Sequence, residues 1–294
     1  MDTTELSAQW QHERRLISAY RLDEAKEAVM QTYRQVQARY GDNSWESAGC
    51  LMNLGLWHEA QGEYASFETL MRQSVQLFRR HRADAPAEAL KAQFYYARAL
   101  CRQGKWQQAA EQAAEVYSAQ CQYYGEHADH DDIAHTLRLQ GNINAMQPAT
   151  LGEALPLLEQ AAAMLERLHG MHHAETAYTY TQIAEQYAKQ GYIAEAQSVL
   201  RSTNAVLREQ LGSLHPYVAV AQWRLAECCD MQRQYGEAQA HFAEAERILR
   251  DCVGETHPLW LDFWLLTAEH CAAQGQIEAA LSAYGKALFV CLKS

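Results

Sequence analysis

The sequence predicts an all-α protein made of about seven antiparallel helical hairpins. Three observations predict it: marker residues recur every 42 positions, apolar residues recur at spacings of three and four, and no apolar–polar alternation indicates a strand. A fixed period of this length is typical of a stacked array, in which each hairpin buries its apolar face against its neighbours. We therefore expect residues 1–294 to form a single solenoid.

The repeat interval is marked by small residues and by histidines. Two sets separated by 42 residues are Ala184, Ala226 and Ala268, and His173, His215 and His257. Seven such intervals account for the whole chain, and the expected hairpins are residues 1–41, 42–83, 84–127, 128–172, 173–214, 215–256 and 257–294. Three extra residues between Gly125 and Ala154 shift the register, so we expect a change of curvature or a contacting loop there.

Residues 173–215 illustrate how a hairpin is specified. His173 stands just before the first helix, as His215 and His257 do in later copies, which indicates a repeated helix-entry residue. Gly191 ends that helix because glycine readily adopts the positive φ of a helix C-terminus. Ala184 and Ala196 are small, and we expect them where the two antiparallel helices approach closely.

The copies share a pattern of a large apolar residue followed by a small one, and later a Glu-Ala pair. Examples are Leu54-Gly55, Ile183-Ala184, Leu225-Ala226, Glu195-Ala196 and Glu237-Ala238. This pattern resembles tetratricopeptide repeats, whose usual period is about 34 residues. The longer interval and the turns at 211–216 and 253–258 resemble the repeats of kinesin light chains and their bacterial relatives. The resemblance implies a right-handed α–α superhelix that binds a protein or peptide partner.

Composition narrows the classes of ligand. A formal net charge of −11 disfavours nucleic acid, because phosphate binding needs a basic surface. No stretch approaches the roughly 20 apolar residues of a membrane helix, and the N-terminus lacks a signal pattern. Eight scattered cysteines without a CxxC pair are typical of reduced thiols. We expect a cytoplasmic, non-enzymatic protein with no cofactor, no metal site, no nucleic-acid ligand and no membrane contact.

The resemblance also implies where a partner binds, because in such arrays the first helix of each hairpin lines a concave groove. The charged, amide and aromatic residues expected to face that groove are Arg14, Lys91, Phe94, Arg98, Arg102, Arg138, Asn142, Tyr178, Glu185, Trp223, Glu227, Asp230 and Glu269. Their order makes the groove basic in its N-terminal half and acidic in its C-terminal half. Such a groove suits an extended peptide or helix that carries both charge signs.

Other interpretations of these residues stay open. The charges could form an ordinary solvated helix face with pairs between residues i and i+4. The chain could be a sensor that changes shape when a peptide or small molecule binds, or an enzyme with a site in the groove. His127, Asp129, His130 and Asp132 could gather on one loop around a metal ion, although nothing in their spacing requires it.

The last expected helix differs from the others in having apolar residues around much of its surface. Ala287 to Leu292 are all apolar, whereas the first and last repeats of an array need polar outer faces. Two alternatives follow: this helix packs fully into its own hairpin, or its outer side contacts another chain. We expect a contact at Phe289 with a second copy or another partner.

Overall fold

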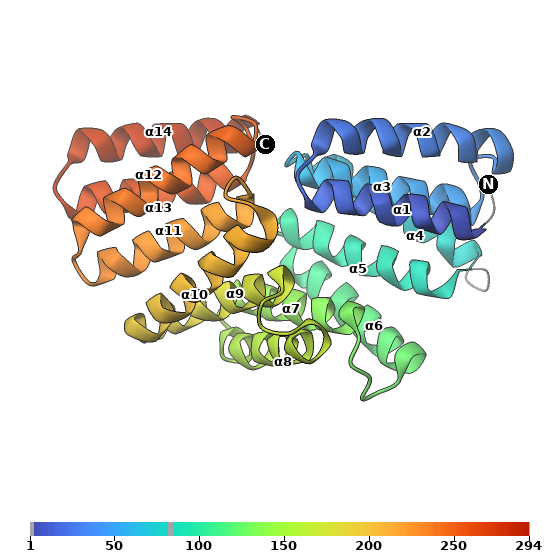
Figure 1. Ribbon diagram of the computed structural model, residues 1–294, viewed down its shortest axis with the longest axis horizontal. Coiled ribbons are helices and arrows are strands. Elements are labelled where there is room, and N and C mark those ends of the chain that lie inside the picture. The colour runs from blue at the N-terminus through green and yellow to red at the C-terminus, as the bar shows by residue number, and fades with distance from the viewer. Residues whose placement is uncertain (1–2, 82–84, 294) are drawn as a thin grey trace. The chain divides into compact units, whose positions relative to one another are not determined.

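The computed structural model describes residues 3–81 and 85–293, which form fourteen α-helices and no strand (Figure 1). The first helices of the hairpins are α1 (Thr3–Ser18), α3 (Trp45–Ala60), α5 (Pro86–Arg102), α7 (Asp131–Ala145), α9 (Ala174–Lys189), α11 (Pro216–Met231) and α13 (Leu259–Ala273). The second helices are α2 (Leu22–Tyr40), α4 (Tyr64–Arg80), α6 (Trp106–Tyr124), α8 (Leu151–His169), α10 (Ile193–Leu211), α12 (Tyr235–Cys252) and α14 (Ile277–Lys293). The predicted all-α solenoid class, built from helical hairpins, is confirmed.

The chain divides into two compact units, one ending at Glu153 and the other beginning at Ala154. Within each unit, helices that follow one another along the chain lie side by side, as α3 and α4 do in the first and α11 and α12 in the second (Figure 1). The boundary falls at the end of the segment in which the sequence departs from its regular interval. A single continuous solenoid over all the hairpins stays a prediction.

Six of the hairpins turn through three residues whose central residue adopts positive φ. These central residues are Tyr20, Gly62, Gly104, Gly191, Arg233 and Gly275, with φ between 56° and 89°. Left-handed backbone is strained for residues with a Cβ, so glycine is the expected choice. The hairpin of α7 and α8 lacks this turn, because residues 146–150 connect its helices instead.

Histidines begin four of the first helices, and their rings perform the same task in each. Nδ1 of His130, His173, His215 and His257 accepts a hydrogen bond from the backbone N–H two residues later, at 3.1–3.3 Å. Each ring thereby satisfies one of the donors that a helix N-terminus leaves without an intrahelical partner. The predicted helix-entry role of the three later histidines is confirmed.

Small residues allow the helices of each unit to pack closely. Ala184 and Ala196 are completely buried, as expected for residues at the contact between α9 and α10. In the first unit, a Cβ added to Gly49 would lie 2.2 Å from the Trp10 ring, so α3 and α1 can approach only because this residue is glycine. Among residues 3–81 and 85–293, no helix combines the length and apolar character needed to cross a bilayer.

Candidate functional site

The first unit carries a stripe of charged and aromatic side chains along α5. Its members are Glu88, Lys91, Tyr95, Arg98 and Arg102, spaced by three, four, three and four residues, which places them on one helix face. We call them the α5 stripe. Ion pairs connect it to the first helices of the two preceding hairpins, so α1, α3 and α5 contribute to one surface.

At one end of the α5 stripe, two cations share the carboxylate of Glu88. Arg14 on α1 donates from Nη2 to Glu88 Oε2 at 2.7 Å, and Lys91 Nζ lies 3.0 Å from Oε1. Burial alone would raise the pKa of Glu88, but the charges of Arg14 and Lys91 hold it below its usual value. Burial likewise opposes the charge of Arg14, whose pKa is nevertheless raised by Glu88.

At the other end, two arginines share the carboxylate of Glu59 on α3. Arg98 Nη2 pairs with Oε2, and Arg102 Nε lies 3.2 Å from Oε1. The guanidinium of Arg98 also stands 4.7 Å from the centre of the Tyr95 ring, a distance at which cations are attracted to aromatic faces. Each end of the stripe therefore has two cations for one carboxylate, and the surface keeps an excess of positive charge.

A buried polar group lies behind this surface. Asn53 on α3 accepts from Arg14 Nε at 2.9 Å and donates to Glu13 Oε2 at 2.6 Å. Glu13 is almost fully buried, and burial raises the pKa of its carboxyl. The contacts of Asn53 fix where the Arg14 guanidinium is held between α1 and α5.

The second unit has the opposite arrangement, one arginine between two carboxylates. Arg224 on α11 reaches Glu185 on α9 at 2.8 Å and Glu227 on its own helix at 2.9 Å, and Lys189 pairs with the other oxygen of Glu185 at 2.8 Å. We call these four residues the Arg224 cluster. Burial opposes both charges, yet their attraction raises the pKa of Arg224 and lowers that of Glu185.

Asp230 and His270 form a further pair in the second unit. His270 Nδ1 lies 2.6 Å from Asp230 Oδ1, and its Nε2 is within 3.2 Å of Gln239 and 2.9 Å of Gln274. The ring is 2% exposed, so both of its nitrogens are engaged inside the protein. Desolvation raises the pKa of Asp230. This arrangement joins α11 to α13 and leaves the imidazole no open side for a substrate.

The structure places most of the expected groove residues on half-buried or exposed positions of the first helices. Arg14, Lys91, Arg98, Arg138, Asn142, Tyr178, Glu185, Glu227 and Asp230 are half-buried, and Arg102 and Glu269 are exposed. Tyr178 stacks on Tyr217 with ring centres 3.7 Å apart. The ion pairs connect subsets of these residues within each unit, whereas Glu269 joins neither the α5 stripe nor the Arg224 cluster.

The prediction that Phe94 and Trp223 face the groove is wrong. Phe94 and Trp223 are buried in the apolar cores of their units, because each lies one position, about 100° of helix rotation, away from the charged face. The residues that occupy that face are their neighbours Tyr95 and Arg224. The spacing of three and four residues through Arg98 would have identified Tyr95.

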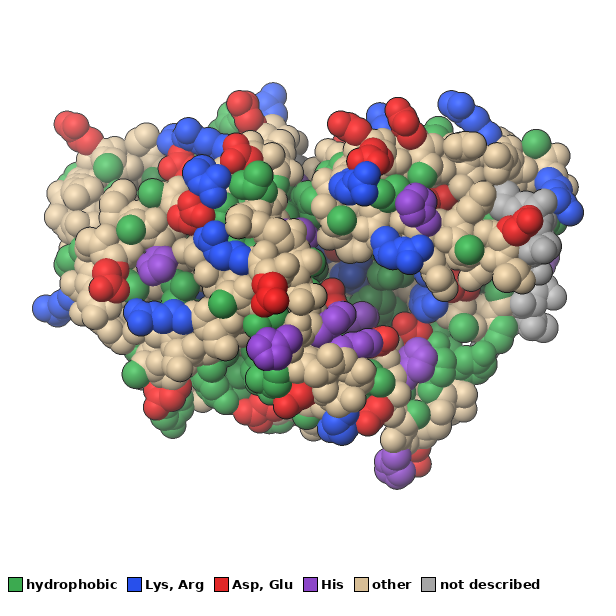
Figure 2. Space-filling model, viewed as in Figure 1, with side chains coloured by type: hydrophobic (Ala, Val, Ile, Leu, Met, Phe, Trp, Pro, Cys, Tyr) green, Lys and Arg blue, Asp and Glu red, His purple; other side chains and the backbone are tan. Residues whose placement is uncertain are grey.

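The expected charge order also needs correction. The stretch expected to be basic contains acidic partners, and the stretch expected to be acidic contains a basic one. Glu59 and Glu88 lie among the cations of the first unit, and Arg224 lies among the carboxylates of the second. Figure 2 shows blue and red side chains interspersed on the visible face of each unit. The pairs are also not mainly contacts between residues i and i+4, because Arg98–Glu59 and Arg224–Glu185 connect successive hairpins, 39 residues apart.

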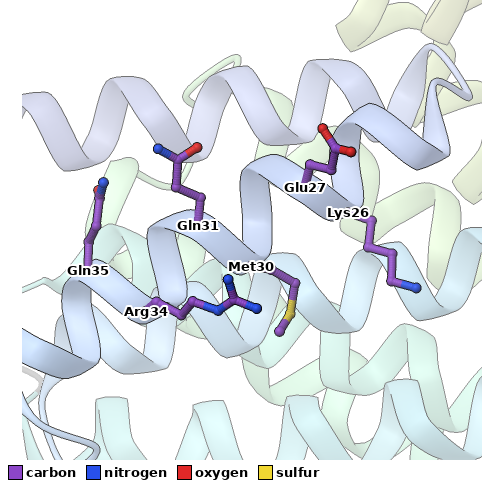
Figure 3. Close-up of a pocket in the computed structure, with 6 residues that line it drawn as sticks. All are labelled: Lys26, Glu27, Met30, Gln31, Arg34 and Gln35. Atoms are coloured by element: carbon purple, nitrogen blue, oxygen red, sulfur yellow. The ribbon is translucent and has the colours of Figure 1, made fainter.

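A hollow of about 450 Å³ lies elsewhere, on α2. It is lined by Lys26, Glu27, Met30, Gln31, Arg34 and Gln35, which Figure 3 shows along one helix. Lys26 is directed toward the Trp57 ring, with Nζ 5.1 Å from its centre. Because the lining residues belong to a single second helix, this hollow is separate from the first-helix surfaces described above.

His130 and the Cys228–Cys229 pair have structural contacts that explain their presence. His130 caps α7 and stacks on Tyr124, which donates to Asp132 at 2.6 Å. Within the described ranges, no three His, Cys, Asp or Glu side chains are grouped to hold a metal ion. Cys228 and Cys229 are both buried, and burial raises the pKa of Cys228 to about 12. A thiol of that pKa is a poor nucleophile at neutral pH.

Family comparisons match one stretch in each unit. Tetratricopeptide-repeat models match residues 47–82 and residues 175–251. The first stretch covers α4 and all but the first two residues of α3, and the second runs from α9 to α12. No curated protein sequence matches the chain. The resemblance to tetratricopeptide repeats is thereby confirmed.

Three solved structures illustrate the similarity in fold. Kinesin light chain-like repeats from Podosopora anserina are 22% identical, with a TM-score of 0.50, covering 68% of this chain and 93% of that one. A Rap protein in complex with Competence and Sporulation Factor is 12% identical, with a TM-score of 0.67 and 99% coverage of both chains. NprR with its cognate peptide NprX is 12% identical, with a TM-score of 0.70, covering 97% and 79%. At these identities the likeness concerns the fold.

Proposed function

We propose that this tetratricopeptide-repeat chain is a binding protein whose first-helix surfaces hold an extended segment or a helix of a partner protein. The α5 stripe binds acidic groups of the partner, and the carboxylates of Glu185, Glu227 and Glu269 bind basic groups. Binding and scaffolding constitute the whole mechanism, and the chain catalyses no reaction. Two observations support the proposal that the ligand is a protein or peptide: the type of repeat, and the peptide bound to the similarly folded NprR.

The observation that carries the proposal is the ratio of charges in the α5 stripe. Glu88 is shared by Arg14 and Lys91, and Glu59 is shared by two arginines. Four cations thus face two carboxylates, so this surface keeps net positive charge that attracts a further carboxylate. An incoming Asp or Glu side chain can therefore bind without displacing Glu59. Tyr95 offers an aromatic surface for an adjacent apolar group.

Selection from a displayed library of random peptides tests the proposal directly. The full chain and a variant with Arg98→Gln and Arg102→Gln are used as matched baits. We expect the wild type to enrich peptides with Asp or Glu next to an apolar residue, and the variant to lose that enrichment at least tenfold. Glutamine keeps much of the side-chain volume and removes the charge, but Glu59 then loses both of its cationic partners, so circular dichroism must show that the double variant is folded before it is used as bait.

An exposed arginine outside these surfaces supplies the control. Arg250 on α12 is paired only within its own helix, to Glu246, and Arg250→Gln should enrich the same peptides as the wild type. If the double variant enriches the same sequences as the wild type, the α5 stripe is not the binding surface. If no bait enriches any peptide, a short linear ligand is excluded.

A peptide-responsive regulator is the second candidate function. The observation that favours it is the similar fold of the quorum sensor NprR, which has been crystallised both alone and with its peptide. A regulator should change its radius of gyration in small-angle X-ray scattering when the selected peptide is added. An adaptor should keep the same radius within a few tenths of an ångström.

A further inference from the structure

The cations of the first-unit surface form two separate pairs along one face of α5. Arg14 and Lys91 share one carboxylate, and Arg98 and Arg102 share the other. The carboxylate side chain that the two arginines share is only 11% exposed, against 27% and 43% for the arginines themselves. A partner therefore meets positive charge at two distinct places on this face.

The positions of the two pairs along α5 set the distance between the groups that they can bind. Lys91 lies seven residues before Arg98 and eleven before Arg102, on the same helix face. At 1.5 Å per residue these separations are about 10.5 and 16.5 Å, so the arginine pair is centred about 13 Å from Lys91. Tyr95 lies between the two pairs, with its ring centre 4.7 Å from the Arg98 guanidinium. A partner that uses both pairs must carry two acidic groups at that separation.

We propose that the α5 stripe selects an extended segment that lies along α5 and carries two Asp or Glu residues four positions apart. This inference rests on the proposed binding function and narrows its ligand. An extended chain rises about 3.3 Å per residue, so four residues span about 13 Å, whereas two span about 7 Å and six about 20 Å. Alternate side chains of an extended chain point the same way, so the residue midway between the two acids faces α5 at the level of Tyr95.

A helical segment matches the two pairs less well. Its acidic residues would have to be seven or eleven positions apart, which pairs Lys91 with only one of the two arginines. In the extended segment, the second carboxylate reaches the centre of the arginine pair, where each of its two oxygens can accept from one guanidinium. A short helix is also marginal in water unless the rest of the partner stabilises it.

Three peptides of identical composition, titrated into the wild-type chain at low salt, test the spacing by fluorescence anisotropy. They are Ser-Ser-Glu-Leu-Glu-Ser-Ser, Ser-Glu-Ser-Leu-Ser-Glu-Ser and Glu-Ser-Ser-Leu-Ser-Ser-Glu, with the glutamates two, four and six positions apart. Acetylated and amidated ends carry no charge, so the three peptides have equal net charge. We expect the four-residue spacing to bind at least fivefold more tightly than the other two. The same order should hold when serine replaces leucine in all three, because the spacing acts through the charges.

Variants of the chain assign the two ends of the segment. Lys91→Gln and Arg102→Gln, shown to be folded by circular dichroism, should each weaken binding of the four-spaced peptide and abolish its advantage over the other two. Lys293→Gln, at an exposed lysine of α14, is the matched control and should preserve that advantage.

The results that would overturn the spacing differ from those that would overturn acidic binding itself. Equal affinities of the three peptides for the wild type would contradict the spacing and leave the α5 stripe as an acidic-binding surface. Tighter binding of an alanine-rich helical peptide, with its glutamates seven positions apart, would contradict the extended conformation. Absence of binding by every peptide would remove the proposed function of the α5 stripe together with its spacing.

Discussion

At the scale of single residues, half-buried ion pairs between successive hairpins hold the first helices together. Arg224 is the clearest case, because its guanidinium pairs with carboxylates on two helices while only 20% of its side chain is exposed. Such a pair costs desolvation when it forms, so its net contribution is modest. Removing one partner is different, because it leaves the other charge buried without compensation.

We therefore expect Arg224→Gln to lower the free energy of unfolding by about 3 kcal/mol. Arg224→Lys should lower the free energy of unfolding by less, because it keeps the positive charge. It should still be less stable than the wild type, because lysine cannot pair with Glu185 and Glu227 through separate donors. Urea denaturation followed by circular dichroism measures both. Arg250→Gln, on the surface of α12, should stay within about 0.5 kcal/mol of the wild type. Equal stability of the two glutamine variants would show that the Arg224 cluster contributes little.

The buried carboxyl of Glu13 should make the free energy of unfolding depend on pH. Burial raises its pKa above the ordinary 4.5, so between 4.5 and the raised value the folded state binds more protons than the unfolded state. Stability contributed by this group therefore falls as pH rises through that window. Glu13→Gln has no charge to lose and still can accept from Asn53, so its stability relative to the wild type should increase with pH above 4.5 and then level off. A constant difference from pH 4 to 7 would contradict this account.

At the scale of elements, the hairpin turn demands left-handed backbone whether or not the sequence supplies glycine. Arg233 adopts φ 59° at the position that Gly191 occupies, with φ 89°, in the preceding hairpin. A residue with a Cβ loses roughly 1 kcal/mol or more in this conformation. Arg233→Gly should accordingly raise the free energy of unfolding by about 1 kcal/mol, and Gly191→Ala should lower it by a similar amount. Chemical denaturation of the two variants compares them, and a destabilised Arg233→Gly would show that its side chain matters more than the turn.

The elements themselves could be predicted from the sequence, because turns and close contacts repeat at one interval. The helix-entry histidines were identifiable for the same reason. His130 was not, since the irregular segment hid its equivalence to His173. Side-chain direction was the weak point: a repeat interval locates a helix, but one position decides between the core and the surface, as Phe94 and Tyr95 show.

At the scale of the whole molecule, the −11 net charge hides the local distribution. The expected order, basic residues first and acidic residues later, did not include the counter-charges that the structure places among them. Glu59 and Arg224 were missed because their partners are about one repeat away, and such contacts follow from the packing of hairpins and not from neighbours in sequence. The binding role, the absence of catalysis and the location of the chain in the cell stay predictions.

The most direct test of the central claim is the affinity of a defined acidic peptide for the α5 stripe. A fluorescent peptide of alternating Glu and Leu is titrated with the wild type, Arg102→Gln and Arg250→Gln, and anisotropy gives the dissociation constants. We expect binding that weakens at least fivefold with Arg102→Gln, weakens with added salt, and is unaffected by Arg250→Gln. Equal affinities for all three proteins, or no binding by any of them, would contradict it.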